Sequence, residues 1–215
     1  MQCHGDPTNA TAAGASCVDL AVASWTPKPI VMDEVRYEGN ISAEWGALSA
    51  ADETQRFWLF FAKGAHTGHS ECILPAAWTS ACTGTSGYPP GECACSPNMW
   101  WNHGGALNGG AARKLAFFRT YVDALPVDFS TLTSIALAPG VFWLSAPNAT
   151  FSFVLWDASM LAAPVRVLVP LPAARAFRLR SVDYEGGAFA DLGTRDGPID
   201  FTPPTAGFAL ELVVA

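Results

Sequence analysis

From Pro126 to the C-terminus, the chain consists of short β-rich runs that are mostly separated by Pro, Gly, Asn or Asp. Apolar and polar residues alternate clearly in two of these runs, 178–182 and 209–213. Short alternating runs with turn residues between them are typical of antiparallel sandwiches. We therefore expect an antiparallel β-sandwich over residues 126–215, with strands at 135–137, 141–145, 151–156, 165–169, 176–183, 188–192, 199–202 and 208–214.

The first half of the chain has a different pattern, because segments with helical periodicity alternate with short apolar runs. A helix is expected at 52–63, where Ser49 can cap the first turn and Gly64 ends the last. A second helix is expected at 111–125, with one apolar stripe along its length.

A short apolar run at 29–32 stops at two carboxylates, Asp33 and Glu34. An uninterrupted apolar run of strand length suits a parallel strand that is buried on both faces. A second short strand is expected within 65–74, so the order strand, helix, strand, helix predicts a parallel α/β layer. Acidic groups at the C-terminal end of such a strand lie where α/β barrels build their active sites. Glu34 is therefore the leading candidate for a catalytic carboxylate.

These patterns divide the chain into three parts. Residues 1–27 are small, polar and turn-rich, and we expect an irregular N-terminal segment there. Residues 28–125 are expected to form the α/β part, with a cysteine-rich insertion at about 75–97. Residues 126–215 form the expected sandwich, so the fold class is α/β followed by all-β.

The charge of the chain argues against two classes of partner. The formal net charge is -7, and the 12 Lys and Arg residues are scattered along the sequence. Nucleic acids and anionic membrane surfaces attract clustered positive charge, so neither is an expected partner. No apolar run is long enough to span a bilayer.

Six cysteines indicate an oxidising compartment. Four of them, Cys72, Cys82, Cys93 and Cys95, lie in or beside the insertion. They lack the Cys-x-x-Cys spacing of a zinc site, and the nearby histidines fit no zinc-finger pattern, so disulfides are favoured over zinc. The pairing stays open, and no metal or other cofactor is expected.

Two further signals bear on localisation. Asn9, Asn40 and Asn148 each begin an Asn-x-Ser/Thr sequon, although such triplets also arise by chance. The residues after Met1 do not form a signal peptide, because no basic start or apolar stretch follows. Either the cysteines are reduced, or the true N-terminus lies upstream.

Several segments together resemble the apiosidase-like glycoside hydrolases of the collagen-binding type. The resemblance rests on motifs that occur in the same order over residues 28–215, apart from the insertion. They are KPIVMDE at 28–34, YEGNI at 37–41, WG at 45–46, RFW at 56–58, HSE at 69–71, WW at 100–101, GGALNG at 104–109, AFFR at 116–119, VDY at 182–184 and DLG at 191–193.

This resemblance implies the end of a (β/α)8 barrel followed by the β-sandwich that these hydrolases carry after it. Glu34 matches the seventh-strand position, where it would be the nucleophile. The fourth-strand segment, which carries the general acid in the family, has no counterpart here. The resemblance therefore implies a truncated, secreted hydrolase of plant or algal polysaccharides that is inactive by itself, with the missing barrel half as a partner.

Each candidate site residue also has a structural interpretation. Glu34 could pair with Arg36 at the end of its strand. Tyr37 and Glu38 are candidate substrate contacts, although a solvated loop acid is the preferred interpretation of Glu38. His69 and Glu71 would share one face of a strand and could bind a sugar hydroxyl or form a structural pair.

Trp100 and Trp101 stand in a glycine-rich loop. Aromatic faces pack against the C–H faces of sugar rings, so this pair could form a platform for an oligo- or polysaccharide. Alternatively, the two rings could fill space between the barrel and the sandwich. A second functional hypothesis is a non-catalytic, carbohydrate-binding or scaffold protein in which the sandwich is the working unit.

Overall fold

The computed structural model describes residues 29–32, 38, 48–68, 73–74, 106–107, 110–205 and 207–215. The predictions for 1–27, for the cysteine-rich insertion and for all six cysteines lie outside these ranges. No described helix is long and apolar enough to cross a membrane.

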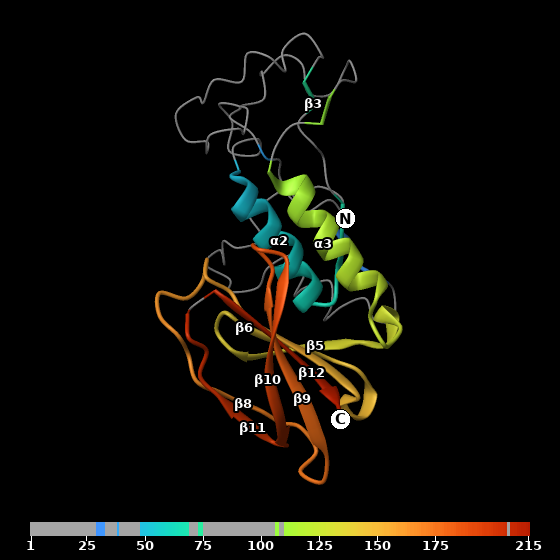
Figure 1. Cartoon of the computed structure of the whole chain (residues 1–215), viewed down its shortest axis with the longest axis vertical. Helices are drawn as coiled ribbons and strands as arrows, with labels where there is room; N and C mark the ends of the chain where they lie inside the picture. The colour runs from blue at the N-terminus through green and yellow to red at the C-terminus, as the bar shows by residue number, and fades with distance from the viewer. Residues whose placement is uncertain are drawn as a thin grey trace.

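The C-terminal part is a six-stranded sheet in which every pairing is antiparallel (Figure 1). The strand order is β10-β9-β12-β7-β6-β5. The strands are β5 Thr133–Ala138, β6 Val141–Ser145, β7 Phe151–Trp156, β9 Ala176–Asp183, β10 Ala188–Asp196 and β12 Phe208–Val214. Each of these strands was predicted, and β6, β7, β9 and β12 have the predicted bounds.

One face of this sheet is covered by a short antiparallel pair, β8 Val167–Val169 and β11 Ile199–Phe201. Alternate side chains of the large sheet point toward this pair, as expected from the period of two along a strand. The buried cluster between the two layers includes Val154, Trp156, Phe177, Leu179, Leu210, Leu212, Val169 and Ile199. Strands in two layers therefore enclose one apolar core.

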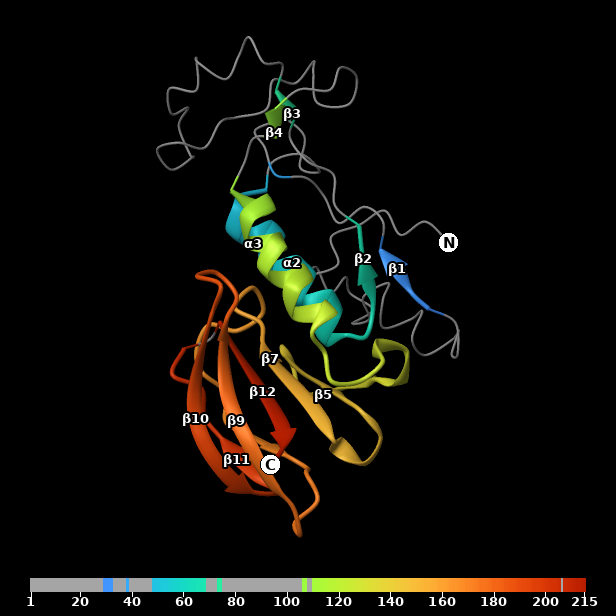
Figure 2. The ribbon, with the colours of Figure 1, turned by 45° about the vertical axis from the view of Figure 1, so that its right-hand side comes forward.

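The opposite face of the large sheet is covered by two helices, α2 Ala50–Ala62 and α3 Ala111–Asp123, which lie side by side (Figures 1 and 2). Trp58 of α2 is fully buried and stacks on Phe153 of β7 with ring centroids 5.7 Å apart. The same indole contacts rings from α3, including Phe118 and Tyr121. One aromatic core therefore contains residues from both sides of the predicted boundary near Pro126.

The capping residues predicted for α2 are confirmed, although the helix begins two residues earlier and ends one residue earlier than the predicted range 52–63. The Ser49 side chain accepts the backbone N–H of Asp52 at 3.1 Å, which satisfies one of the free amides of the first turn. Gly64 follows the helix with φ +77°, a left-handed conformation that glycine adopts without steric cost. The local signals at both ends therefore decide the extent of this helix.

Two short strands lie beside the helices. β1 Val31–Met32 and β2 His66–Thr67 are paired in parallel, and α2 lies between them in the chain. The prediction that β1 is buried on both faces is wrong, because Val31 is 59% exposed. Among the described residues, only the Met32 face is covered, by α2 and α3.

The remaining elements are short. β3 Ile73–Leu74 and β4 Ala106–Leu107 form an antiparallel pair. Two 3-10 turns, Phe129–Thr131 and Pro147–Ala149, precede β5 and β7 respectively.

Candidate active site

The candidate site lies at the edge where the parallel strands β1 and β2 both end. The backbone N–H of His66 donates to Ile30 O, and that of Gly68 donates to Met32 O, both at 2.8 Å. Both strands therefore leave the pair at the same edge. With α2 between them, they form a strand–helix–strand unit, whose C-terminal edge is where α/β folds place ligand sites.

The predicted site residues follow directly from this edge in the sequence. Glu34 comes two residues after Met32, and His69 comes directly after Gly68. The structure thus brings together the strand ends from which both predicted groups continue. The side chains of Glu34, Tyr37, His69, Glu71, Trp100 and Trp101 lie outside the described residues, so their roles remain predictions.

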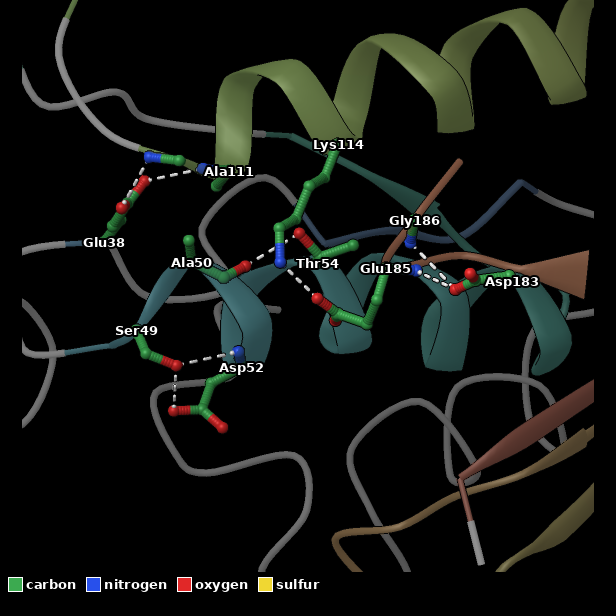
Figure 3. A network of polar contacts seen from close by, with 11 residues as sticks. Glu38, Ser49, Ala50, Asp52, Thr54, Ala111, Lys114, Asp183, Glu185 and Gly186 are labelled. Atoms are coloured by element: carbon green, nitrogen blue, oxygen red, sulfur yellow. Dashed lines mark hydrogen bonds and ion pairs between the residues drawn. The ribbon is translucent and has the colours of Figure 1, made fainter. Parts of the chain in front are cut away.

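Glu38 is the one predicted site residue that the structure describes. It is 4% exposed, so its interpretation as a solvated loop acid is wrong. Its Oε1 accepts the backbone N–H of Gly110 at 2.9 Å, and its Oε2 accepts that of Ala111 at 3.0 Å (Figure 3). A carboxylate at this position satisfies two free amides and interacts favourably with the dipole of α3. Glu38 therefore caps a helix that has no side-chain cap of its own.

A second buried carboxylate holds the backbone of Glu38. Oε2 of Glu53, in the first turn of α2, accepts the N–H of Glu38 at 2.9 Å, and Glu53 is fully buried. Glu38 thus connects the segment after β1 to the first turns of both helices. The starts of α2 and α3 meet at this point, on the side of the molecule toward which β1 and β2 run.

Further polar contacts connect α3 to the large sheet. Lys114 pairs with Glu185 in the turn between β9 and β10 (Figure 3). Asp183 Oδ1 accepts the backbone N–H of Gly186 at 2.8 Å and orders the same turn. This part of α3 is therefore tied to the sheet by an ion pair on an ordered turn.

A partly buried ion pair lies on the sheet next to Tyr121 of α3. Arg180 of β9 donates to both carboxylate oxygens of Glu211 on β12, at 2.5 and 3.1 Å, and Glu211 is 3% exposed. This bond raises the pKa of the Arg180 guanidinium. Burial, and then the adjacent Glu211 carboxylate, hold the pKa of Tyr121 well above its usual value. The raised pKa values keep Arg180 charged and Tyr121 neutral near neutral pH, so a structural role fits these two groups better than proton transfer.

Two of these features were not predicted from sequence. The burial of Glu38 depends on amides 72 and 73 residues further along the chain, so no local pattern indicates it. Tyr121 lies beside the predicted apolar stripe of α3, and its position next to Glu211 depends on how the helix packs. Within the described ranges, no three His, Cys, Asp or Glu side chains are grouped as a metal site would require.

Comparisons with known proteins identify the type of fold. No known protein family matches the sequence, and no curated protein matches it. Solved structures with a similar fold include a candidate glycoside hydrolase from Bacteroides vulgatus (19% identity, TM-score 0.58) and a family 5 glycoside hydrolase from the same organism (15%, 0.59). A third is described only as a glycoside hydrolase (14%, 0.53).

These similarities cover 87%, 92% and 91% of this chain, and 36%, 43% and 44% of the respective structures. The chain thus spans less than half the length of the hydrolases that it matches. At these identities the comparison concerns the fold alone, and the chain has a glycoside hydrolase-like fold.

Proposed function

We propose that this chain is the end of an apiosidase-like (β/α)8 glycoside hydrolase barrel together with the β-sandwich domain that follows it. The complete protein cleaves glycosidic bonds in plant or algal polysaccharides. The observation that supports this proposal is the parallel β1–β2 pair. In the sequence, the segments that carry Glu34 and His69 both continue from the C-terminal edge of this pair. The exposed side chain of Val31 also fits a barrel, because it lies on the face opposite the helices.

In this proposal Glu34 is the nucleophile. Its carboxylate attacks the anomeric carbon, while a general acid protonates the leaving glycosidic oxygen. Water then attacks the glycosyl-enzyme ester, releases the sugar and restores the Glu34 carboxylate. The general acid belongs to the fourth barrel strand, which has no counterpart in this chain, and would be supplied by the missing barrel half.

Other predicted residues bind the substrate in this account. Trp100 and Trp101 supply a platform for sugar rings, and His69 with Glu71 binds a hydroxyl group. Tyr37 lies close to Glu34 in the sequence and contacts the reacting sugar. Glu38 does not need to contact it, because both of its carboxylate oxygens already accept backbone amides.

Hydrolysis by the complete gene product tests the proposal. The protein, with any upstream sequence that its gene encodes, is incubated with a panel of plant and algal polysaccharides, and released reducing ends are measured. We expect cleavage of at least one polysaccharide. The variant E34Q keeps the size of the side chain but is a poor nucleophile, so it should lose several orders of magnitude in rate. Residues 1–215 alone should be inactive or nearly so.

The exposed carboxylate of Asp123 offers a matched control. It pairs with Arg119 on the surface of α3, away from the candidate edge. D123N should therefore cleave at the wild-type rate. Equal rates for E34Q and D123N would contradict the role of Glu34, and no cleavage of any polysaccharide by the complete protein would contradict the proposed activity.

Non-catalytic glycan binding is the second candidate function, and one surface feature favours it. Phe189 on the edge strand β10 is 43% exposed, with the Arg180 guanidinium 4.2 Å from its ring centroid. An exposed aromatic ring beside a hydrogen-bond donor can hold a sugar. Glycan-array binding by the whole chain that is lost in F189A would support this function, and equal binding by F189A would contradict it.

A further inference from the structure

The turn between β6 and β7 carries a sequence motif that the proposed function does not use. Asn148, Ala149 and Thr150 form an Asn-x-Thr sequon in which the middle residue is not proline. Oligosaccharyl transfer to asparagine requires this triplet, and its product lies on the surface of secreted proteins. The other two sequons, at Asn9 and Asn40, lie outside the described residues.

The structure places Asn148 at the tip of this turn. Both Asn148 and Thr150 are exposed, while Ala149 between them is buried. The backbone is held in place, because Ala149 N–H donates to Ala146 O at 2.9 Å and Arg175 Nη1 donates to Asn148 O at 2.8 Å. Of Asn148, these bonds use only the main-chain oxygen.

The side chains of the motif have no structural task among the described residues. The Asn148 amide makes no hydrogen bond to any of them, and neither does the Thr150 hydroxyl. Asn148 adopts φ +57°, and this left-handed conformation by itself favours asparagine in a turn. It does not explain Thr150, which sits exposed after the turn with a backbone φ of -64°. The threonine is the part of the motif that the fold does not require.

We propose that Asn148 carries an N-linked glycan. In the transfer step, Asn148 Nδ2 forms a bond to the anomeric carbon of an oligosaccharide carried on a lipid diphosphate. The bond between that carbon and the diphosphate oxygen breaks, and the amide loses one proton to solvent. The lipid diphosphate leaves with the bonding electrons, so no oxidant or reductant takes part.

Asn148 lies far from the candidate active-site edge, so a glycan on it would not cover that edge. β6 ends at Ser145, which pairs with Thr133 at the start of β5, and β5 follows the C-terminal end of α3. The candidate active-site edge lies at the other end, where Glu38 caps the start of α3. A helix of 13 residues spans about 20 Å. A glycan on Asn148 would therefore project from the end of the molecule opposite the predicted substrate edge.

Mass spectrometry of the protein purified from its own cells tests the proposal. Peptide N-glycosidase converts a glycosylated asparagine into aspartate, so the peptide with Asn148 should contain aspartate after treatment and only trace unmodified asparagine before it. The same enzyme should increase the gel mobility of the full chain.

Variants produced through a eukaryotic secretory pathway separate the three sequons. In a background with N9Q and N40Q, the wild-type turn should keep one glycan, while N148Q and T150A should both lose it. T150S should keep the glycan, because serine also completes the sequon. Attachment occurs before export, so cell lysate and medium are both measured.

Two outcomes would overturn the proposal. One is an unmodified Asn148 peptide as the main species in the protein from its own cells. The other is a glycan that persists in T150A, because attachment would then not depend on the sequon. N148Q should leave hydrolysis or glycan binding unchanged, whichever activity the complete protein has.

Discussion

The backbone N–H of Glu38 donates to Oε2 of Glu53 at 2.9 Å, so one buried carboxylate holds the backbone of another. Glu38 in turn uses both of its own oxygens to cap α3. The segment that follows β1 is thereby attached to the first turns of both helices. If Glu34 is the nucleophile, this attachment lies four residues after it and contributes to its position.

Replacing Glu38 should destabilise the protein. E38A leaves the amides of Gly110 and Ala111 without their acceptors in a buried place, which should cost about 1–3 kcal/mol in the free energy of unfolding. E38Q keeps one carbonyl oxygen and should fall between E38A and wild type. Denaturant unfolding followed by circular dichroism measures the difference.

The exposed Glu185 is the control for this experiment. Its ion pair with Lys114 is on the surface, so E185Q should change the free energy of unfolding by less than about 1 kcal/mol. An E38A protein as stable as E185Q would show that the cap of α3 does not depend on Glu38.

Removal of the Trp58 side chain should destabilise the helices and the sheet together. It is fully buried and contacts α3 and β7 at once, so W58A should cost about 3–5 kcal/mol. Hydrogen exchange should rise together in α3 and in β7. Exchange that rises in the helices alone would contradict a common core. I135A, at an exposed position on β5, should change stability by about 0.5 kcal/mol or less.

The Arg180–Glu211 pair should contribute far more than a similar pair beside it. R180A leaves the buried Glu211 carboxylate without its guanidinium, and we expect a loss of about 1–3 kcal/mol. Arg178 of β9 pairs with Asp191 of β10 on the other side of the same strand, but both are exposed, so R178A should cost less than about 1 kcal/mol. Urea unfolding of both variants tests this difference, and equal losses would contradict it.

Tyr184 should make stability fall at alkaline pH. Burial, followed by nearby carboxylates of which Glu185 is the first, raises its pKa from 10.0 to about 12. Above pH 10.0 the unfolded chain releases this proton while the folded chain retains it, so stability falls as pH rises toward about 12. The difference is on the order of 2 kcal/mol.

Unfolding of wild type and Y184F as a function of pH measures this effect. The two proteins should have parallel stability curves below pH 10.0. Above it, wild type should lose stability more steeply than Y184F. Identical slopes in the alkaline range would contradict a raised pKa for Tyr184.

Most of the sheet could be predicted from sequence because its signals are local. Alternation and turn residues indicate where β9 and β12 begin and end, and both have the predicted bounds. β10 is longer than predicted, because its pairing with β9 continues past an irregularity between Asp191 and Gly193. The longer extent of β10 depends on its pairing with β9, and the local sequence of β10 does not indicate it.

The candidate site was less predictable, because it depends on contacts between distant segments. Which face of β1 is covered depends on the helices, so the exposure of Val31 could not be read from an apolar run. Glu38 looks like any acid in a loop until α3 is packed beside it. The parallel direction of β1 and β2, in contrast, followed from the order strand, helix, strand, and it is confirmed.

The most direct test of the proposed function is covalent trapping of Glu34. Fluorosugars with a dinitrophenyl leaving group need no general acid, because dinitrophenolate leaves without protonation, and they form a stable ester with the nucleophile of a retaining hydrolase. Mass spectrometry of the complete protein should find one sugar, attached to the peptide with Glu34, and none in E34Q. A sugar attached to another carboxylate, or trapping that E34Q leaves unchanged, would contradict the account.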